Sequence, residues 1–218
     1  MPAYKAFLFD MNGTMVNDMH FHQRAWYQII VNELGAPLTE DQLKLEMYGK
    51  NEELFDRVFG AGKFPEDQVK ELSMRKEKQY QAEFLPHLRL IDGLDNFMAD
   101  AQTRGTKMAI GTAAIRFNVD YVLDRLDIRG YFPVIIGPED VKVSKPDPEV
   151  FLLGAEKLGV EPAACVVFED SPKGIEAARR AGMKAVGIST YHTAEELAND
   201  ALLFVVDDYT DPRLQDLF

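Results

Sequence analysis

Short apolar runs recur along most of this chain, and their spacing is the feature that most limits its fold. One run, Ala6-Phe7-Leu8, stands near the N-terminus, and five more follow residue 87, separated by segments with helical spacing. Short strands that alternate with helices are typical of a parallel sheet covered on both faces. The sequence therefore predicts an α/β protein. The later predicted strands are Lys107–Gly111, Val134–Ile136, Cys165–Phe168, Lys184–Ile188 and Leu203–Val206.

The segments between these runs carry helix-start and helix-stop residues. Asp147-Pro148 reads as an N-cap followed by the first helical residue, and Gly159 stands just past the expected end. Ser171-Pro172 repeats the start signal, and Gly182 repeats the stop signal. These signals predict the start and the end of two helices that cover the sheet, one between residues 147 and 159 and one between residues 171 and 182.

Residues 16–86 differ in kind from the rest of the chain. Apolar residues recur there at helical spacing, and the charged segment 66–84 carries no strand signal. An all-helical block between the first strand and the later ones is most simply a separate domain. We therefore predict a core made of residues 1–15 and 87–218, with an inserted helical cap formed by residues 16–86.

Composition excludes several classes of function. The net charge of −12 argues against binding to nucleic acid, which needs a basic face. The N-terminal apolar run is too short for a signal peptide or a membrane span. The single cysteine, Cys165, rules out an internal disulfide and suits a reducing compartment, so we expect a cytoplasmic protein.

Polar residues follow three of the predicted strands. Asp10 comes after the first strand, Thr112 after 107–111, and the pair Glu169 and Asp170 after 165–168, while Lys145 lies in a proline-rich loop. Ligands of parallel sheets bind outside the carboxyl ends of the strands. A carboxylate that can attack phosphorus, a hydroxyl, an ammonium and an acidic pair together predict a phosphate and metal site.

Each of these residues has a plainer interpretation when it is taken alone. Asp10 could cap the turn that follows it, and Thr112 could belong to an ordinary turn. Lys145 could be an exposed loop lysine, and Asp170 could assist the start of the next helix. The prediction of a site depends on all of them occurring together.

Taken in order, Asp10, Thr112, Lys145 and the pair Glu169-Asp170 resemble the motifs of the haloacid dehalogenase superfamily, which forms an aspartyl phosphate on its nucleophile. The resemblance covers essentially the whole chain and is nearest to the β-phosphoglucomutase-like branch with an α-helical cap. It implies a Rossmann-like core and an enzyme that needs Mg²⁺. Phosphatases and mutases that act on sugar phosphates both occur in this branch.

The resemblance also implies a role for each motif residue. Asp10 would be the nucleophile and a Mg²⁺ ligand, Asn12 would ligate the metal through its backbone carbonyl, and Asp170 would be the second carboxylate ligand. Glu169 would support the metal shell. The transferring phosphoryl group would be held by Thr112, the adjacent residue Ala113 and Lys145.

Asn12 departs from the family pattern, which has aspartate at the position of the general acid and base. The chain as written is therefore expected to have low activity. One change from aspartate to asparagine in an otherwise intact motif set is the simplest explanation, and we take it as an engineered substitution. The alternative is a catalytically inactive pseudoenzyme that binds phosphate, since Asn12 cannot transfer a proton.

In the cap, the resemblance implies substrate contacts from His22, Lys50, Asn51 and Lys76. His22 lies four residues before Trp26, on the same helix face. The alternative for His22 is a partly buried histidine with a structural role.

Two regions argue against a mutase. Mutases of this branch grip a second phosphate with an arginine where this chain has Glu52, and they use a Ser-Lys pair where it has Ala114 and Ile115. We therefore predict a phosphatase acting on a small phosphorylated metabolite such as a sugar phosphate, with the mutase as the alternative. Similar small capped enzymes are often monomers, and we expect a monomer.

Overall fold

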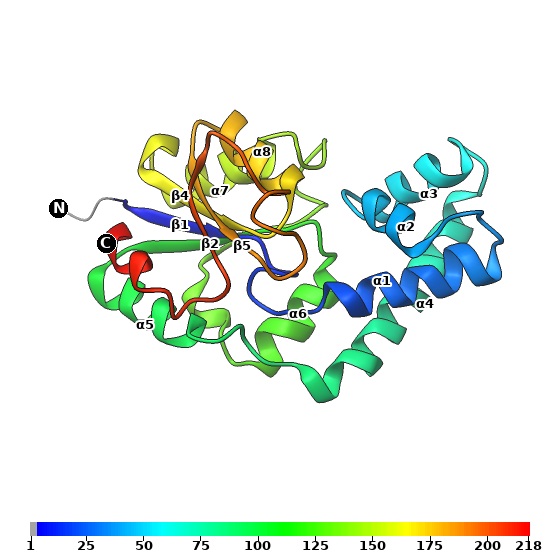
Figure 1. Cartoon of the computed structure of the whole chain (residues 1–218), viewed down its shortest axis with the longest axis horizontal. Helices are drawn as coiled ribbons and strands as arrows, with labels where there is room; N and C mark the ends of the chain where they lie inside the picture. The colour runs from blue at the N-terminus through cyan, green and yellow to red at the C-terminus, as the bar shows by residue number, and fades with distance from the viewer. Residues whose placement is uncertain (1–3) are drawn as a thin grey trace. The chain divides into compact units, whose positions relative to one another are not determined.

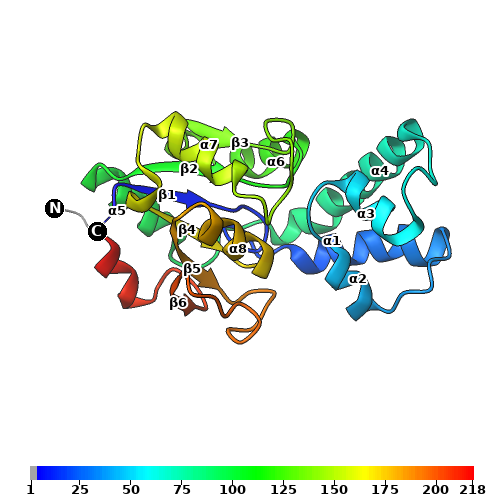
Figure 2. The same ribbon diagram turned by 90° about the horizontal axis from the view of Figure 1, so that it is seen from above.

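Six parallel strands form one sheet in the order β3-β2-β1-β4-β5-β6 in the computed structural model, which describes residues 4–218 (Figures 1 and 2). Every neighbouring pair in this sheet is parallel. The predicted α/β fold is confirmed. The strands are β1 Ala6–Phe9, β2 Lys107–Gly111, β3 Val134–Ile136, β4 Cys165–Glu169, β5 Lys184–Ile188 and β6 Leu202–Val206.

The centre of the sheet is β1, which pairs with β2 on one side and with β4 on the other. Phe9 lies level with Ile110 of β2 and with Phe168 of β4. The residues that follow these three positions therefore leave the sheet at the same edge. From β1 the chain adds β2 and β3 on one side of the sheet and β4, β5 and β6 on the other. Doubly wound sheets bind their ligands at such a switch point.

Alternating side chains of β1 face the two layers of helices. Ala6 and Leu8 join a buried apolar cluster with residues of α7 and α8, on one face. Phe7 and Phe9 face the other side, where Phe7 stacks on Phe97 of α5 with their ring centroids 5.3 Å apart. Figure 1 shows α6 on the same side as α5. These helices are α5 Leu94–Arg104, α6 Arg116–Arg125, α7 Glu149–Leu158 and α8 Pro172–Arg180.

The helix ends agree with the sequence signals, with one shift. The hydroxyl of Ser171 accepts a hydrogen bond from the Gly174 amide, so the predicted cap of α8 is confirmed. Helix α7 begins at Glu149 with Pro148 in the N-cap position, one residue later than predicted. Asp147 still supports this start, because its carboxylate accepts the Glu149 amide at 3.0 Å.

Residues Asp18–Leu88 form a second compact unit, inserted between β1 and α5, that contains helices and no strand. Its own apolar core includes Trp26, Ile30, Leu43 and Phe55. Its helices are α1 Met19–Tyr27, a π-helix at Gln28–Glu33, α2 Glu40–Glu46, α3 Asn51–Phe59 and α4 Glu66–Phe84.

Short 3₁₀ segments complete the secondary structure, at Leu85–His87, Arg129–Tyr131, Pro162–Ala164 and Pro212–Leu217. Among the helices of residues 4–218, none is both long and apolar enough to cross a bilayer.

Candidate active site

The ammonium of Lys145 joins two carboxylates at the carboxyl edge of the sheet. Its Nζ donates to Oδ1 of Asp10 at 2.6 Å and to Oε1 of Glu169 at 2.7 Å. Burial opposes the positive charge, but the two carboxylates outweigh it and raise the pKa of Lys145 above its usual range. Lys145 is therefore a fixed cation between the ends of β1 and β4.

Glu169 is held on both of its oxygens. While Oε1 accepts from Lys145, Oε2 accepts from the amide of Ser171 at 2.8 Å and from its hydroxyl at 2.9 Å. A Cβ added to Gly174 would lie 1.7 Å from Oε1, so only glycine fits beside this carboxylate. These contacts fix Glu169 as a support for Lys145.

Asp170 lies directly against the turn that follows Asp10. It is 3% exposed, and the Thr14 hydroxyl donates to its Oδ1 at 3.4 Å. A Cβ on Gly13 would lie 2.1 Å from Oδ2, and Gly13 also has a φ of +75°. Glycine at position 13 is therefore required both by the backbone and by the carboxylate that occupies the neighbouring space.

Thr112 follows β2, beside the end of β1. Its amide donates to the Ile136 carbonyl at 3.0 Å, and its hydroxyl accepts from the Ala114 amide at 3.0 Å. Thr112 is buried and Ala113 is exposed. The turn that carries the predicted phosphate contacts is thus ordered by bonds to β3 and by its own threonine.

The oxygen donors at this edge fit a small hard cation. Within residues 4–218, no group of three or more His, Cys, Asp and Glu side chains is arranged to hold a metal by itself. Asp10 and Asp170, with a backbone carbonyl and oxygens from water and substrate, are the kind of set that Mg²⁺ prefers. The space that Gly13 leaves for the Asp170 carboxylate is consistent with that use.

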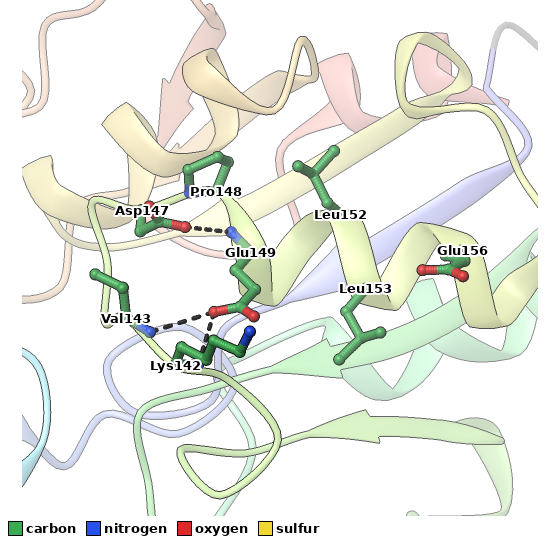
Figure 3. Close-up of a pocket in the computed structure, with 8 residues that line it drawn as sticks. All are labelled: Lys142, Val143, Asp147, Pro148, Glu149, Leu152, Leu153 and Glu156. Atoms are coloured by element: carbon green, nitrogen blue, oxygen red, sulfur yellow. Dashed lines mark hydrogen bonds between the residues drawn. The ribbon is translucent and has the colours of Figure 1, made fainter.

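A surface pocket of about 410 Å³ lies beside the loop that carries Lys145 (Figure 3). Its lining includes Lys142, Val143 and Leu152, and none of the predicted site residues. Glu149 accepts from the amides of Lys142 and Val143 at 2.7 and 3.2 Å. This pocket therefore belongs to the outer surface of α7, where Glu149 anchors the loop.

The helical unit contains its own buried cluster of charged side chains. Nζ of Lys76 lies 2.6 Å from Nδ1 of His22 and donates to Oε2 of Glu77 at 3.0 Å. Asn51 donates to the other oxygen of Glu77 at 3.3 Å. Three of the residues predicted for substrate contact in the cap, His22, Asn51 and Lys76, are thus brought together through Glu77.

Tyr80 and Asp18 complete this cluster. The Tyr80 hydroxyl donates to Oδ2 of Asp18 at 2.5 Å, and the Tyr80 ring stacks on His22 with centroids 3.7 Å apart. Burial lowers the pKa of Lys76, and the carboxylates of Glu77 and Asp18 only partly oppose that shift.

Lys50, the fourth residue predicted for substrate contact in the cap, lies at the start of α3, where its amide donates to Glu53 at 3.0 Å.

Several site residues went unnoticed in the sequence. Glu77 and Tyr80 have no motif, and nothing in their spacing distinguishes them from the other residues of the charged helix α4. Asp18, which precedes α1, has no motif either. Cys165 is buried, and burial raises the pKa of its thiol to about 11, as expected of a packing residue.

Comparison with known proteins gives consistent matches over nearly the whole chain. A model of the haloacid dehalogenase-like hydrolases matches residues 4–182. Validoxylamine A 7′-phosphate phosphatase of Streptomyces hygroscopicus subsp. limoneus is 32% identical over 96% of each chain. β-Phosphoglucomutase of Bacillus subtilis is 32% identical over 84% of this chain and 83% of its own. The structure of a haloacid dehalogenase family IA hydrolase from Entamoeba histolytica matches with a TM-score of 0.85 and 27% identity. The match covers 98% of this chain and 97% of that one.

Proposed function

Because this chain belongs to the haloacid dehalogenase-like hydrolases, we propose that it is a Mg²⁺-dependent phosphatase of small phosphorylated metabolites such as sugar phosphates. The observation that carries the proposal is the Lys145 ammonium, which holds Asp10 at 2.6 Å and Glu169 at 2.7 Å. A buried cation against a carboxylate at the end of the central strand suits attack on a dianionic phosphate.

In the proposed reaction, an Asp10 oxygen forms a bond to phosphorus while the bond from phosphorus to the ester oxygen breaks. The leaving oxygen takes up a proton, and water then attacks the aspartyl phosphate to release phosphate and regenerate Asp10. Lys145 offsets the charge of the phosphoryl group, and Thr112 and Ala113 hold its oxygens. Asp10, Asp170 and the Asn12 carbonyl would hold Mg²⁺, which supplies charge that reduces repulsion between carboxylates and phosphate.

Asn12 limits this reaction. An amide can neither protonate the leaving oxygen nor take a proton from the attacking water, so both proton transfers fall to solvent. Positioned acids and bases typically contribute on the order of 10²–10⁴-fold. We propose that the chain as written is a slow form of the enzyme and that the asparagine is an introduced substitution.

Similarity alone does not separate a phosphatase from a mutase, since one relative of each kind is 32% identical to this chain. The residues do favour one of them. Glu52 would repel a second phosphate group at the position where the mutases have an arginine. Ala114 and Ile115 lack the hydroxyl and the ammonium of the mutase pair. Phosphate release to water is therefore the favoured outcome.

The helical unit would serve as the cap that selects the substrate. Its buried cluster supplies the polar groups, with His22, Asn51 and Lys76 among them, and Lys50 lies in the loop that precedes α3. We propose that these residues contact the part of the substrate that is not phosphorylated. A cytoplasmic location and a monomeric state remain predictions.

One experiment tests the phosphatase against its alternatives. The Asn12→Asp variant is assayed with Mg²⁺ against a panel of sugar phosphates, by phosphate release and by a coupled assay for interconversion of hexose 1- and 6-phosphates. Phosphate release from at least one substrate supports the proposal. Interconversion without release identifies a mutase. No turnover of any substrate, with phosphate still bound, identifies the phosphate-binding pseudoenzyme that Asn12 also allows.

A further inference from the structure

Three successive carbonyls in the turn after Asp10 accept hydrogen bonds from residues outside that turn. The Thr190 hydroxyl donates to the Gly13 carbonyl, and the Tyr209 hydroxyl donates to the Thr14 carbonyl at 3.1 Å. The Ile91 amide donates to the Met15 carbonyl at 2.9 Å. The position of this turn is therefore set by three separate segments of the core as well as by its own residues.

A fourth contact holds the other side of the site. Nδ1 of His192 lies 2.9 Å from the carbonyl oxygen of Asp170. A carbonyl can only accept, so this nitrogen carries the hydrogen and donates it. His192 thus holds the backbone of the residue whose carboxylate lies against Gly13.

The three side-chain donors lie in the segments that follow the last two strands, β5 and β6, which carry none of the family motifs. Thr190 and His192 follow β5, and Tyr209 follows β6. Tyr209 is 5% exposed, and burial, with the charges of Asp10 and Asp170, raises its pKa well above the usual range. Its phenol therefore keeps the proton that it donates.

We propose that Thr190, His192 and Tyr209 are positioning residues that hold the Asp10 turn and Asp170 in the geometry needed for metal binding. This inference rests on the proposed function. The carbonyl of Asn12 belongs to the peptide unit next to Gly13, so the bond from Thr190 to the Gly13 carbonyl limits how that unit can rotate. Outer contacts of this kind orient ligands, and losing one typically lowers metal affinity about 10–100-fold.

At Thr190 and His192, pairs of variants separate the loss of the hydrogen-bond donor from a change in side-chain shape. Thr190→Val removes the hydroxyl and keeps the branched side chain, whereas Thr190→Ser keeps the hydroxyl. His192→Leu removes the donor, whereas His192→Asn places an amide nitrogen near the position of Nδ1. The matched control is Thr103→Val, because the Thr103 hydroxyl also donates to a backbone carbonyl, at 2.9 Å in an exposed turn of α5.

The measurement is binding of Mn²⁺ to the full chain, followed by the electron paramagnetic resonance of the unbound ion, with Mg²⁺ as competitor. Thermal unfolding is recorded for each variant. Thr190→Val and His192→Leu should raise Kd about 10-fold or more, while Thr190→Ser and His192→Asn recover most of that loss. Thr103→Val should leave Kd unchanged, even where it lowers Tm by as much as Thr190→Val.

Asp170→Asn serves as the reference that separates the two proposals. If it weakens metal binding while Thr190→Val and His192→Leu bind like the parent, the positioning role is wrong and the proposed function stands. If Asp170→Asn itself binds metal as well as the parent, the proposed metal site is wrong. A fall in Tm without any change in Kd for Thr190→Val would also overturn the inference, because it indicates a role in folding only.

Discussion

Replacing Lys145 with methionine should destabilise the metal-free protein. The ammonium lies 2.6 Å from Asp10 and 2.7 Å from Glu169, and these side chains are between 1 and 11% exposed. At an effective dielectric constant of about 20, each pair is worth roughly 6 kcal/mol before desolvation is subtracted. Removing one partner of a buried ion pair costs about 3–5 kcal/mol, because the remaining charge loses its compensation.

We therefore expect the free energy of unfolding at pH 7 to fall by about 3–5 kcal/mol in Lys145→Met, measured by urea denaturation with circular dichroism. Lys142→Met is the matched control, since Lys142 is an exposed lysine of the same loop. An exposed substitution of this kind should change stability by no more than about 0.5 kcal/mol. Equal stabilities of the two variants would refute the assignment of Lys145 as the compensating cation.

The same pair of proteins gives a dependence on pH. The pKa of Lys145 is raised by folding, so the native state keeps a proton that the unfolded chain loses. Its stabilisation is fully present below the ordinary lysine pKa of about 10.4 and is lost as pH rises towards the folded value. The stability difference between parent and Lys145→Met should therefore shrink above about pH 10 by up to about 1.4 kcal/mol per pH unit. A constant difference contradicts this account.

Three further substitutions test other parts of the structure. Gly13→Ala places a Cβ 2.1 Å from Oδ2 of Asp170 at a φ of +75°, so it should lose about 1–3 kcal/mol of stability and weaken Mg²⁺ binding; calorimetry measures both. Tyr80→Phe leaves the buried Asp18 carboxylate without the hydroxyl that donates to it and should cost about 1–3 kcal/mol in urea denaturation; an unchanged midpoint counts against the cluster. Asp170→Asn should fold normally by circular dichroism but bind Mg²⁺ more weakly. EDTA should abolish the activity of the Asn12→Asp variant, and turnover in excess EDTA would exclude a role for the metal.

The sheet was predictable because parallel strands leave a local signal. Each of the six strands is a short apolar run bounded by turn or helix residues, and the predicted ends agree with the structure to within a residue. The order of the strands could not be read from the sequence in this way. It depends on pairings such as that of β1 with β4, whose partners Phe9 and Phe168 are far apart in the chain.

The clustering of Asp10, Thr112 and the pair Glu169-Asp170 at one edge was predictable because they follow three of the predicted strands, and strands of a parallel sheet end at one edge. Lys145 had a weaker signal, since it lies in a loop and depends on the geometry of that loop to reach Asp10. Its contact with Glu169 was also not predicted. A carboxylate next to a proposed metal ligand gives no sign in the sequence that it also binds a lysine.

Contacts between side chains and distant backbone were the hardest to predict. The bonds from Thr190 and Tyr209 to the turn after Asp10 have no spacing rule, because any hydroxyl near a loop could make them. In the helical unit, Tyr80 and Asp18 lie 62 residues apart and meet only through the packing of α1 on α4. The periodicity of either helix predicts a buried face, but it does not identify the partner of a buried carboxylate.

Restoring the acid and base at position 12 tests the central claim most directly. The measurement is kcat and KM of the parent and of Asn12→Asp for the best substrate of a sugar phosphate panel, with Mg²⁺ present. We predict that kcat rises by about 10²–10⁴-fold, which corresponds to roughly 3–5 kcal/mol of activation barrier, with a much smaller change in KM. An unchanged rate against every phosphorylated substrate would contradict the enzyme and leave a protein that binds phosphate.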